Sequence, residues 1–317
     1  MLHILLLITP VFSLIAIGFL AAKTRYTSDG AGRIVSEVGY KVAMPALLFR
    51  AMLGVGDTPV SPLLLIACYF CGIAFCWLAT ALLAGLVLRR TREDAASIAM
   101  GACFSNGVML GFPIIIQSFG PDAATPIAFL ATCETLFLWL MGTFHMQLVR
   151  QDRDKSLVAA VGDVFVEVAR NPLVVAMGAG LTCRYLGLTV PELPMQIISI
   201  VAQAAVPVSL IGLGMALAGY SIAGQAPTIS VILAMKMVIY PAAAFALATF
   251  VFKLPPVWAG ALVTYVSMPV GANAFLFASR YDRAVASVSA AVAISTAISV
   301  FTVTVMLTLL KNAGIAV

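Results

Sequence analysis

Two hydrophobic segments of this chain are interrupted by short polar patches that also carry glycine and proline, at residues 105–113 and 267–273. Each patch lies near the middle of roughly twenty apolar residues, about the length of helix that crosses a bilayer. A break in such a helix frees backbone N–H and C=O groups, and the new helix N-terminus carries about half a positive charge. Because such helix ends bind anions, carboxylates included, both patches are candidate anion-binding elements.

The candidate substrate-binding residues are the polar, glycine and proline residues of these patches. Proline removes an N–H and clashes with the preceding turn, glycine permits unusual backbone, and asparagine supplies donors and acceptors. An alternative is that both patches are kinks packed against neighbouring helices, with asparagine joining helices. Corresponding positions about half the chain apart favour a binding site in a carrier built from two repeats. The candidates are Ser105, Asn106, Gly107 and Pro113 in the first patch, and Ser267, Pro269, Gly271 and Asn273 in the second.

Two charged residues, Glu134 and Lys236, also lie inside apolar segments. A carboxylate at the centre of a membrane helix costs about 2.5 kcal/mol or more unless it is paired or protonated. Lys236 is the candidate partner of Glu134. The functional interpretation is proton or ion coupling at Glu134, with Lys236 near the substrate. The structural interpretation is an ion pair, or a side chain that faces water.

The composition indicates a membrane protein, because 62% of the residues are hydrophobic, only 10% are charged, and the mean hydropathy is +1.08. Soluble domains are less apolar and carry more charge. The net charge of +5 comes from basic residues in short loops, so we expect no nucleic-acid partner. The sequence has no phosphate-binding glycine loop, no nucleophile elbow and no His-Glu-x-x-His pair. We therefore expect no cofactor, no metal and no enzymatic activity.

The apolar runs predict an all-α membrane protein with ten transmembrane helices, since backbone polar groups in lipid must be satisfied within a segment. The expected ranges are 2–22, 34–54, 61–88, 95–118, 123–148, 164–187, 196–219, 229–252, 257–279 and 284–310.

The basic residues predict the orientation of these helices. Twelve of the 18 Lys and Arg residues fall in the odd-numbered loops, and four fall in the even-numbered loops and the C-terminus. Cytoplasmic loops carry the excess of Lys and Arg. We therefore expect a multi-pass protein of the cell inner (plasma) membrane with both termini extracytoplasmic.

The most polar stretch, residues 149–163, falls at the midpoint and is expected to be a cytoplasmic linker. It joins a first five-helix repeat, 1–148, to a second, 164–317. An odd number of helices in each half makes the second half enter from the opposite side, so the repeats would be inverted. At an offset of 162 residues Pro45 matches Pro207, and Ser105 matches Ser267.

Several motifs, in this order and at this spacing, resemble the auxin efflux carrier family of bacterial and plant secondary transporters, in the bile/arsenite/riboflavin transporter superfamily. The resemblance spans nearly the whole chain. It is carried by residues 10–20, 42–49, 105–107 with 110–113, 171–173, 207–214, Lys236 with Pro241, and 268–273.

The resemblance implies ten helices in two inverted five-helix repeats, with helices 4 and 9 broken and crossing at Pro113 and Pro269. It implies an elevator-type carrier, often a homodimer, with scaffold helices 1, 2, 6 and 7 and transport helices 3–5 and 8–10. Plant members export auxin, and bacterial members are linked mainly to malonate, malate and similar carboxylates. The chain lacks the long central loop of the plant exporters, so it looks like a bacterial member.

These observations predict a secondary active transporter of a small organic anion, working by elevator-type alternating access. The anion is expected to be a mono- or dicarboxylate such as malonate or malate, or an auxin-like acid. A sodium-coupled symporter of the bile-acid type is the alternative, and a membrane-embedded sensor or enzyme is less favoured. The substrate, the direction of transport and the coupling ion stay open from the sequence.

Overall fold

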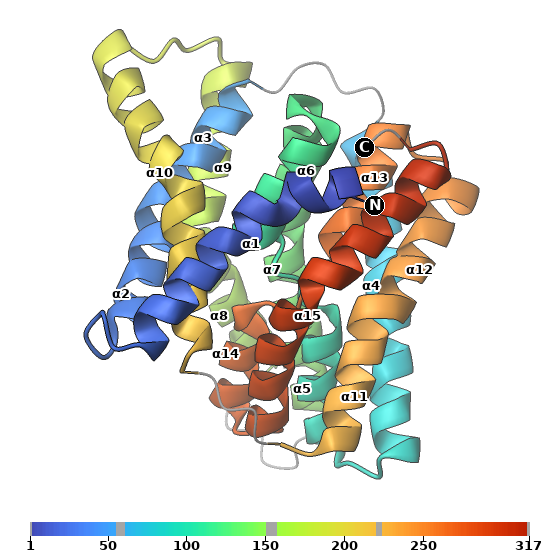
Figure 1. Cartoon of the computed structure of the whole chain (residues 1–317). Coiled ribbons are helices and arrows are strands. Elements are labelled where there is room, and N and C mark those ends of the chain that lie inside the picture. The colour runs from blue at the N-terminus through green and yellow to red at the C-terminus, as the bar shows by residue number, and fades with distance from the viewer. Residues whose placement is uncertain (1, 55–60, 150–156, 220–223, 316–317) are drawn as a thin grey trace.

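The computed structural model describes residues 2–54, 61–149, 157–219 and 224–315, and within these ranges every regular element is a helix (Figure 1). The elements of the first half are α1 (Leu2–Lys23), α2 (Ala31–Val38), η1 (Gly39–Ala43), α3 (Met44–Leu53), α4 (Pro62–Leu82), η2 (Leu83–Val87), α5 (Arg92–Cys103), η3 (Gly107–Gly111), α6 (Phe112–Phe119), η4 (Pro121–Ala123) and α7 (Ala124–Val149).

The second half contributes α8 (Leu157–Ala169), α9 (Pro172–Tyr185), α10 (Glu192–Leu217), α11 (Ala226–Ala234), η5 (Met235–Ile239), α12 (Tyr240–Ala246), η6 (Leu247–Val251), α13 (Pro256–Val266), α14 (Ala272–Tyr281) and α15 (Val285–Asn312). The elements η1, η2, η3, η5 and η6 are π-helical turns. Three predicted helices, 34–54, 61–88 and 229–252, are therefore continuous in the structure but contain wider turns.

Six described helices are long and apolar enough to cross a bilayer: Ile4–Lys23, Pro62–Val87, Pro121–Val149, Glu192–Leu217, Ala226–Val251 and Val285–Asn312. Shorter apolar helices cover Gly107–Phe119 and Pro256–Val266, on one side of each predicted break. Each break divides one apolar segment into two shorter helices. Neither broken segment therefore contains a continuous helix long enough to be among the six.

The sixth predicted helix, 164–187, is not continuous in the structure. α8 ends at Ala169, and α9 begins at Pro172. Asn171 is the N-cap of α9, and its side-chain oxygen accepts the Leu173 N–H at 2.9 Å. A proline in the first turn and a capping asparagine before it start a new helix there.

The expected linker, 149–163, is partly helical. α7 includes Val149, and α8 begins at Leu157, so residues 157–163 are helical. The remaining part of this prediction, 150–156, lies outside the described residues.

The helices form two groups that lie side by side (Figure 1). The α10 bundle consists of α1, α2, η1, α3, α9 and α10, in which α10 contacts α1, α2 and α3, and α3 contacts α9. The crossing bundle consists of α4 to α7 and α11 to α15, in which α5 contacts α4, α7, α14 and α15. The two broken helices belong to the crossing bundle.

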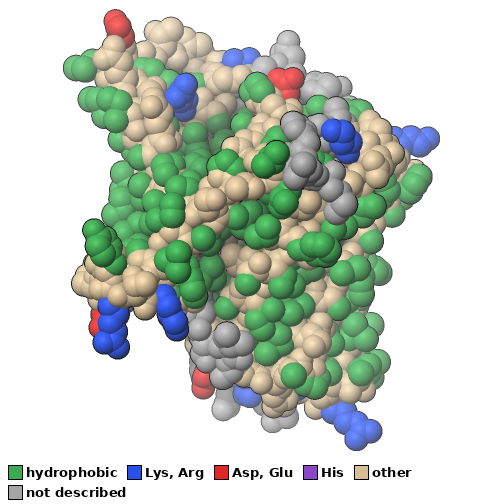
Figure 2. Space-filling model, in the orientation of Figure 1, with side chains coloured by type: hydrophobic (Ala, Val, Ile, Leu, Met, Phe, Trp, Pro, Cys, Tyr) green, Lys and Arg blue, Asp and Glu red, His purple; other side chains and the backbone are tan. Residues whose placement is uncertain are grey.

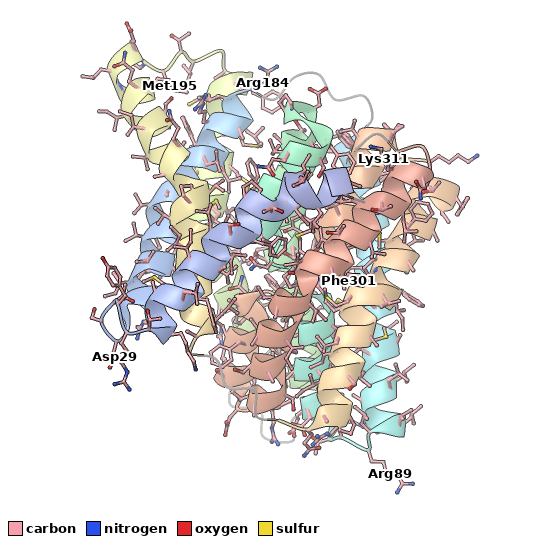
Figure 3. The ribbon with its side chains drawn as sticks, viewed as in Figure 1. Asp29, Arg89, Arg184, Met195, Phe301 and Lys311 are labelled. Atoms are coloured by element: carbon pink, nitrogen blue, oxygen red, sulfur yellow. The ribbon has the colours of Figure 1, made fainter. Side chains whose placement is uncertain are left out.

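The face in Figure 2 has an apolar middle and charged ends, as expected for a protein that lipid surrounds. Phe301, labelled in Figure 3, lies in this middle zone and is 69% exposed. Arg89 and the loop that carries Asp29 lie at one end of the molecule, and Arg184 and Lys311 lie at the other (Figure 3). We call these the Arg89 end and the Lys311 end.

Candidate functional site

The two broken helices meet where their extended residues pair as one isolated antiparallel bridge. The Asn106 N–H donates to the Pro269 carbonyl at 2.8 Å, and the Gly271 N–H donates to the Phe104 carbonyl at 3.0 Å. Each break therefore satisfies part of the other's unpaired backbone, which the hydrocarbon around it could not do. The sequence prediction that both patches are broken, and that they converge, agrees with this geometry.

The crossing lies at Ser105 and Val270, so the position that the family resemblance implied agrees at Pro269, whose carbonyl takes part in it, but not at Pro113. Pro113 is buried near the start of α6, beyond the π-helical turn η3. η3 and α6 form one apolar helix, Gly107–Phe119, so the second half of the broken helix begins at Gly107 and Pro113 lies inside it. Pro113 therefore marks neither the crossing nor the start of that half. Pro269 immediately precedes the bridge.

Glycine is required at two places where the crossing segments approach other groups. A Cβ on Gly271 would lie 2.8 Å from the Ser105 carbonyl oxygen, and a Cβ on Gly107 would overlap the ring of Tyr265. The neighbour of Gly271 is backbone that is itself part of the bridge, so it has little freedom to move. These glycines allow the crossing to be as close as it is.

The side chain of Glu134, in α7, accepts hydrogen bonds from residues of both broken helices. It is 2% exposed, its Oε1 accepts the Ser105 N–H at 2.8 Å, and its Oε2 accepts the Tyr265 hydroxyl at 2.9 Å. The carboxylate therefore satisfies an N–H that the broken helix leaves without a partner in its own backbone. Hydrogen bonds to an ionised acceptor are stronger than neutral ones, so this contact holds the break in place.

Lys236 lies in η5, is fully buried, and binds the other side of the crossing. Its Nζ donates to Ser105 Oγ at 2.6 Å, to the Val266 carbonyl at 3.0 Å and to the Cys103 carbonyl at 3.5 Å. Val266 and Cys103 are the last residues of α13 and α5, where helix carbonyls carry negative partial charge. The ammonium also lies 5.2 Å from the Tyr240 ring centroid.

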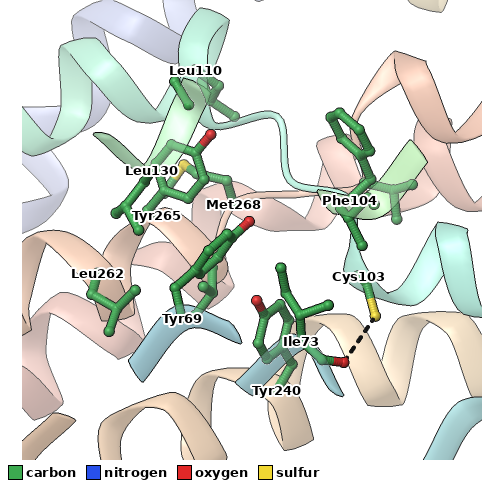
Figure 4. Close-up of a cluster of buried hydrophobic side chains, with 14 of the residues drawn as sticks. Tyr69, Ile73, Cys103, Phe104, Leu110, Leu130, Tyr240, Leu262, Tyr265 and Met268 are labelled. Carbon is green, nitrogen blue, oxygen red and sulfur yellow. Dashed lines mark hydrogen bonds between the residues drawn. The ribbon is translucent and has the colours of Figure 1, made fainter. Parts of the chain in front are cut away.

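Glu134 and Lys236 are thus joined through Ser105, because the carboxylate binds its N–H and the ammonium binds its hydroxyl. The sequence suggests Lys236 as the direct partner of Glu134. The structure places both at the crossing, with one residue between them. Figure 4 shows the aromatic wall beside it, in which the Tyr69 and Tyr265 rings are 6.2 Å apart, edge to face.

A cavity of about 610 Å³ lies between the crossing and the α10 bundle. On one side it is lined by the crossing residues and Glu134, and on the other by Tyr40 and Asn171, whose side-chain Nδ2 donates to the Tyr40 hydroxyl at 3.0 Å. The cavity extends to Arg33 and Lys41 of α2 and η1, which are exposed. It therefore runs from the middle of the molecule toward the Arg89 end.

The predicted site residues divide into those that line this cavity and those that support it. Ser105, Asn106, Gly271, Asn273 and Glu134 line it, whereas Gly107, Pro113, Ser267, Pro269 and Lys236 are not among its lining residues. The Ser267 hydroxyl donates to the Val263 carbonyl one turn earlier, at 2.6 Å, so it serves its own helix.

A family model described as "Membrane transport protein" matches residues 3–307, which is nearly the whole chain. The chain belongs to this family, the auxin efflux carriers. A protein of Rhizobium meliloti (strain 1021) named "Putative malonate transporter" is 27% identical over 314 residues, covering 98% of this chain and 96% of that protein. The resemblance drawn from the motifs is confirmed, and this family member is a multi-pass membrane protein of a transporter family.

Three residues, two at the crossing and one on the opposite wall of the cavity, were not expected from the sequence. Tyr265 binds Glu134, Ser295 Oγ accepts the Val270 N–H at 3.0 Å, and Tyr40 binds Asn171. Tyr265 precedes the second patch by only two residues, so its position was a usable signal. Ser295 lies in a long apolar helix with several serines, and nothing in the sequence separates it from the others.

Proposed function

We propose that this protein is a secondary active carrier of a small organic anion. The observation that carries the proposal is that two broken helices cross at Ser105 and Val270 on the wall of a cavity of about 610 Å³. Small-molecule sites commonly occupy about 300–1,000 Å³ and combine apolar walls with a few polar groups. The cavity has this character.

The crossing supplies the groups that an anion requires. The first amide groups of η3 and α14 have no acceptor within their own helices, and they follow the two breaks directly. Asn106 and Asn273 line the cavity beside them and add side-chain amides. A carboxylate bound here accepts hydrogen bonds from these donors and is stabilised by the positive ends of two helices.

The proposed substrate is a mono- or dicarboxylate such as malonate or malate, or an auxin-like acid. The name of the Rhizobium relative supports a dicarboxylate. The volume of the cavity would also admit an aromatic acid. Arg33, Glu37 and Lys41 stand at the far end of the cavity, where Glu37 pairs with Lys41, so these three residues together carry one net positive charge.

The proposed mechanism is elevator-type alternating access by two inverted five-helix repeats with ten crossings, 1–148 and 164–317, joined by the linker 149–163. The α10 bundle with α8 would be the scaffold, and the crossing bundle would move the site. One relationship supports equivalent halves. In each half, a side chain of the helix that follows the broken helix accepts a backbone N–H from the break. Glu134 of α7 accepts the N–H of Ser105, and Ser295 of α15 accepts the N–H of Val270.

The proposed orientation puts the Arg89 end in the cytoplasm and both termini outside the inner membrane. Arg89 lies at that end, while Arg184 and Lys311, from loops expected outside, lie at the other (Figure 3). The cavity then opens inward. We also propose, from the family resemblance, that two copies of the α10 bundle pair as a homodimer.

Uptake by proteoliposomes that contain the purified protein tests this function. Radiolabelled malonate, malate, monocarboxylates and an indole acid are each offered under an inward proton gradient, a sodium gradient or no gradient, with protein-free liposomes as control. We expect protein-dependent uptake of at least one carboxylate. The absence of transport for every carboxylate under every gradient would contradict the proposal.

A further inference from the structure

A second large cavity, of about 570 Å³, lies away from the crossing. Its walls are α1, the end of α10 and the middle of α15, and they are apolar side chains such as Phe12, Phe19, Leu217 and Val300. Lys23, the last residue of α1, is the one charged residue among the described residues that line it. We call this cavity the α1–α15 groove.

The groove is open on the outside of the molecule. Leu20 is 57% exposed beside it, and Ala297 is exposed on its α15 wall. In Figure 1, α1 and α15 cross the front of the molecule and diverge toward the end of α1 that carries Lys23, and the two helices are in contact. Because this face belongs to the apolar middle zone, the groove faces lipid rather than water.

The groove is long enough to hold much of one acyl chain. Its α1 wall runs from Phe12 to Lys23, which at about 1.5 Å per residue is about 16 Å. The hydrocarbon core of a bilayer is about 30 Å thick, so half of it is about 15 Å. Because α1 runs obliquely across the molecule (Figure 1), the length of the groove is measured along α1, and an acyl chain that lies along it ends beside Lys23.

We propose that the α1–α15 groove binds one acyl chain of an anionic phospholipid, whose phosphate contacts Lys23. The apolar walls bury the chain, and the lysine ammonium pairs with the negative headgroup at the place where the chain emerges. A zwitterionic phospholipid has the same chains but no net negative charge, so it should bind more weakly. A free fatty acid shares the chemistry but lacks the phosphate and the second chain.

If the protein is the carrier proposed above, a lipid bound in this groove would also affect the rate of transport. The groove is formed by α1 and α10 on one side and by α15 on the other, so its walls belong to the two groups of helices that would slide past each other. A bound chain fills the space between them and alters the rate of that movement.

Native mass spectrometry of the purified full-length protein tests the binding without reference to transport. Equal amounts of dioleoyl phosphatidylglycerol, dioleoyl phosphatidylcholine and oleate are added. We expect the protein to retain one phosphatidylglycerol in preference to the other two. Ala297→Trp, which fills the groove from its exposed wall, should abolish that preference. Lys23→Gln should weaken phosphatidylglycerol retention about fivefold, the effect of one basic residue near a charged headgroup.

Two matched variants serve as controls. Ala242→Trp adds the same ring at an exposed position of α12, and Lys311→Gln removes a lysine from the last turn of α15. Both should retain phosphatidylglycerol as the parent does. Equal retention of phosphatidylglycerol and phosphatidylcholine, preferential retention of oleate, or unchanged retention by both Ala297→Trp and Lys23→Gln would overturn the proposal. Lys23 is exposed, so its variant tests the idea even if Ala297→Trp does not fold.

Discussion

The Glu134 carboxylate accepts the backbone N–H of Ser105 at 2.8 Å, so an acid of α7 completes the hydrogen bonding of the broken helix before it. The same carboxylate accepts the Tyr265 hydroxyl from the other broken helix. A buried acid in an apolar helix thereby links both arms of the crossing. This relationship explains why a carboxylate is retained where hydrocarbon makes it costly.

Replacing Glu134 by glutamine should lower carboxylate uptake by about tenfold or more, since hydrogen bonds to a charged group contribute about 1.5–3 kcal/mol each. Glutamine can still accept one bond but presents an N–H₂ group where the carboxylate accepts the other. If Glu134 carries the coupling proton, the variant should also lose the dependence of uptake on pH. Initial rates in proteoliposomes at several pH values measure both effects.

The exposed acid Glu192, in the first turn of α10, provides the control. Glu192→Gln should transport like the parent. If Glu134→Gln leaves both uptake and its pH profile unchanged, Glu134 neither couples transport to protons nor holds the break in place.

Lys236→Met should lower the thermal stability of the detergent-purified protein. The change leaves the Val266 carbonyl and the Ser105 hydroxyl without the ammonium that binds them. Each buried polar group left unpaired costs about 1–3 kcal/mol. Thermal unfolding followed by tryptophan fluorescence measures the shift, with the exposed Lys311→Met as the matched variant. Equal unfolding temperatures for the two variants would mean that Lys236 does not hold the crossing.

Gly271→Ala should abolish transport while the protein still inserts into the membrane. The added methyl would lie 2.8 Å from the Ser105 carbonyl oxygen, so the bridge must open to admit it. Gly178 of α9 has no heavy atom within 4 Å of such a methyl, so Gly178→Ala adds the same group in open space. Uptake by these two variants, at matched expression, should differ strongly. Equal uptake would show that the close crossing is dispensable.

Replacing sodium by potassium should leave uptake unchanged. The carbonyls at the ends of α5 and α13 could otherwise attract a cation, but the Lys236 ammonium already binds them. The protein therefore carries its own positive charge at this position. A strict requirement for sodium in the proteoliposome assay would favour the sodium-coupled alternative and contradict this interpretation.

The sequence was sufficient to predict both breaks, because proline, glycine and asparagine close together inside an apolar run disfavour a continuous membrane helix. It also located Glu134 and Lys236, since a buried charge in a membrane helix is rare. It could not locate the point of crossing. That point depends on which amide faces which carbonyl, and Val270 has no distinctive chemistry that would reveal it.

The role of Ser295 could not be predicted from the sequence, whereas the helix start after Asn171 could have been. Ser295 caps the Val270 N–H only because α15 packs beside the second break, which is a matter of tertiary packing. The end of α8 before Asn171 is a different case, because hydropathy alone predicts one continuous helix there although the sequence contains an Asn-Pro pair. The capping role of an asparagine before a proline would have predicted the new helix start.

The central claim is that the crossing binds a carboxylate, and titration calorimetry of the purified protein with malonate tests it most directly. Asn106→Asp and Asn273→Asp preserve side-chain shape but place negative charge on the cavity wall, and Asn312→Asp makes the same change at the end of α15. We predict that the parent protein binds malonate measurably. The affinity should fall at least about tenfold in Asn106→Asp and in Asn273→Asp, which corresponds to about 1.4 kcal/mol of repulsion. It should be unchanged in Asn312→Asp. Equal affinity for malonate in all three variants and the parent would contradict the account.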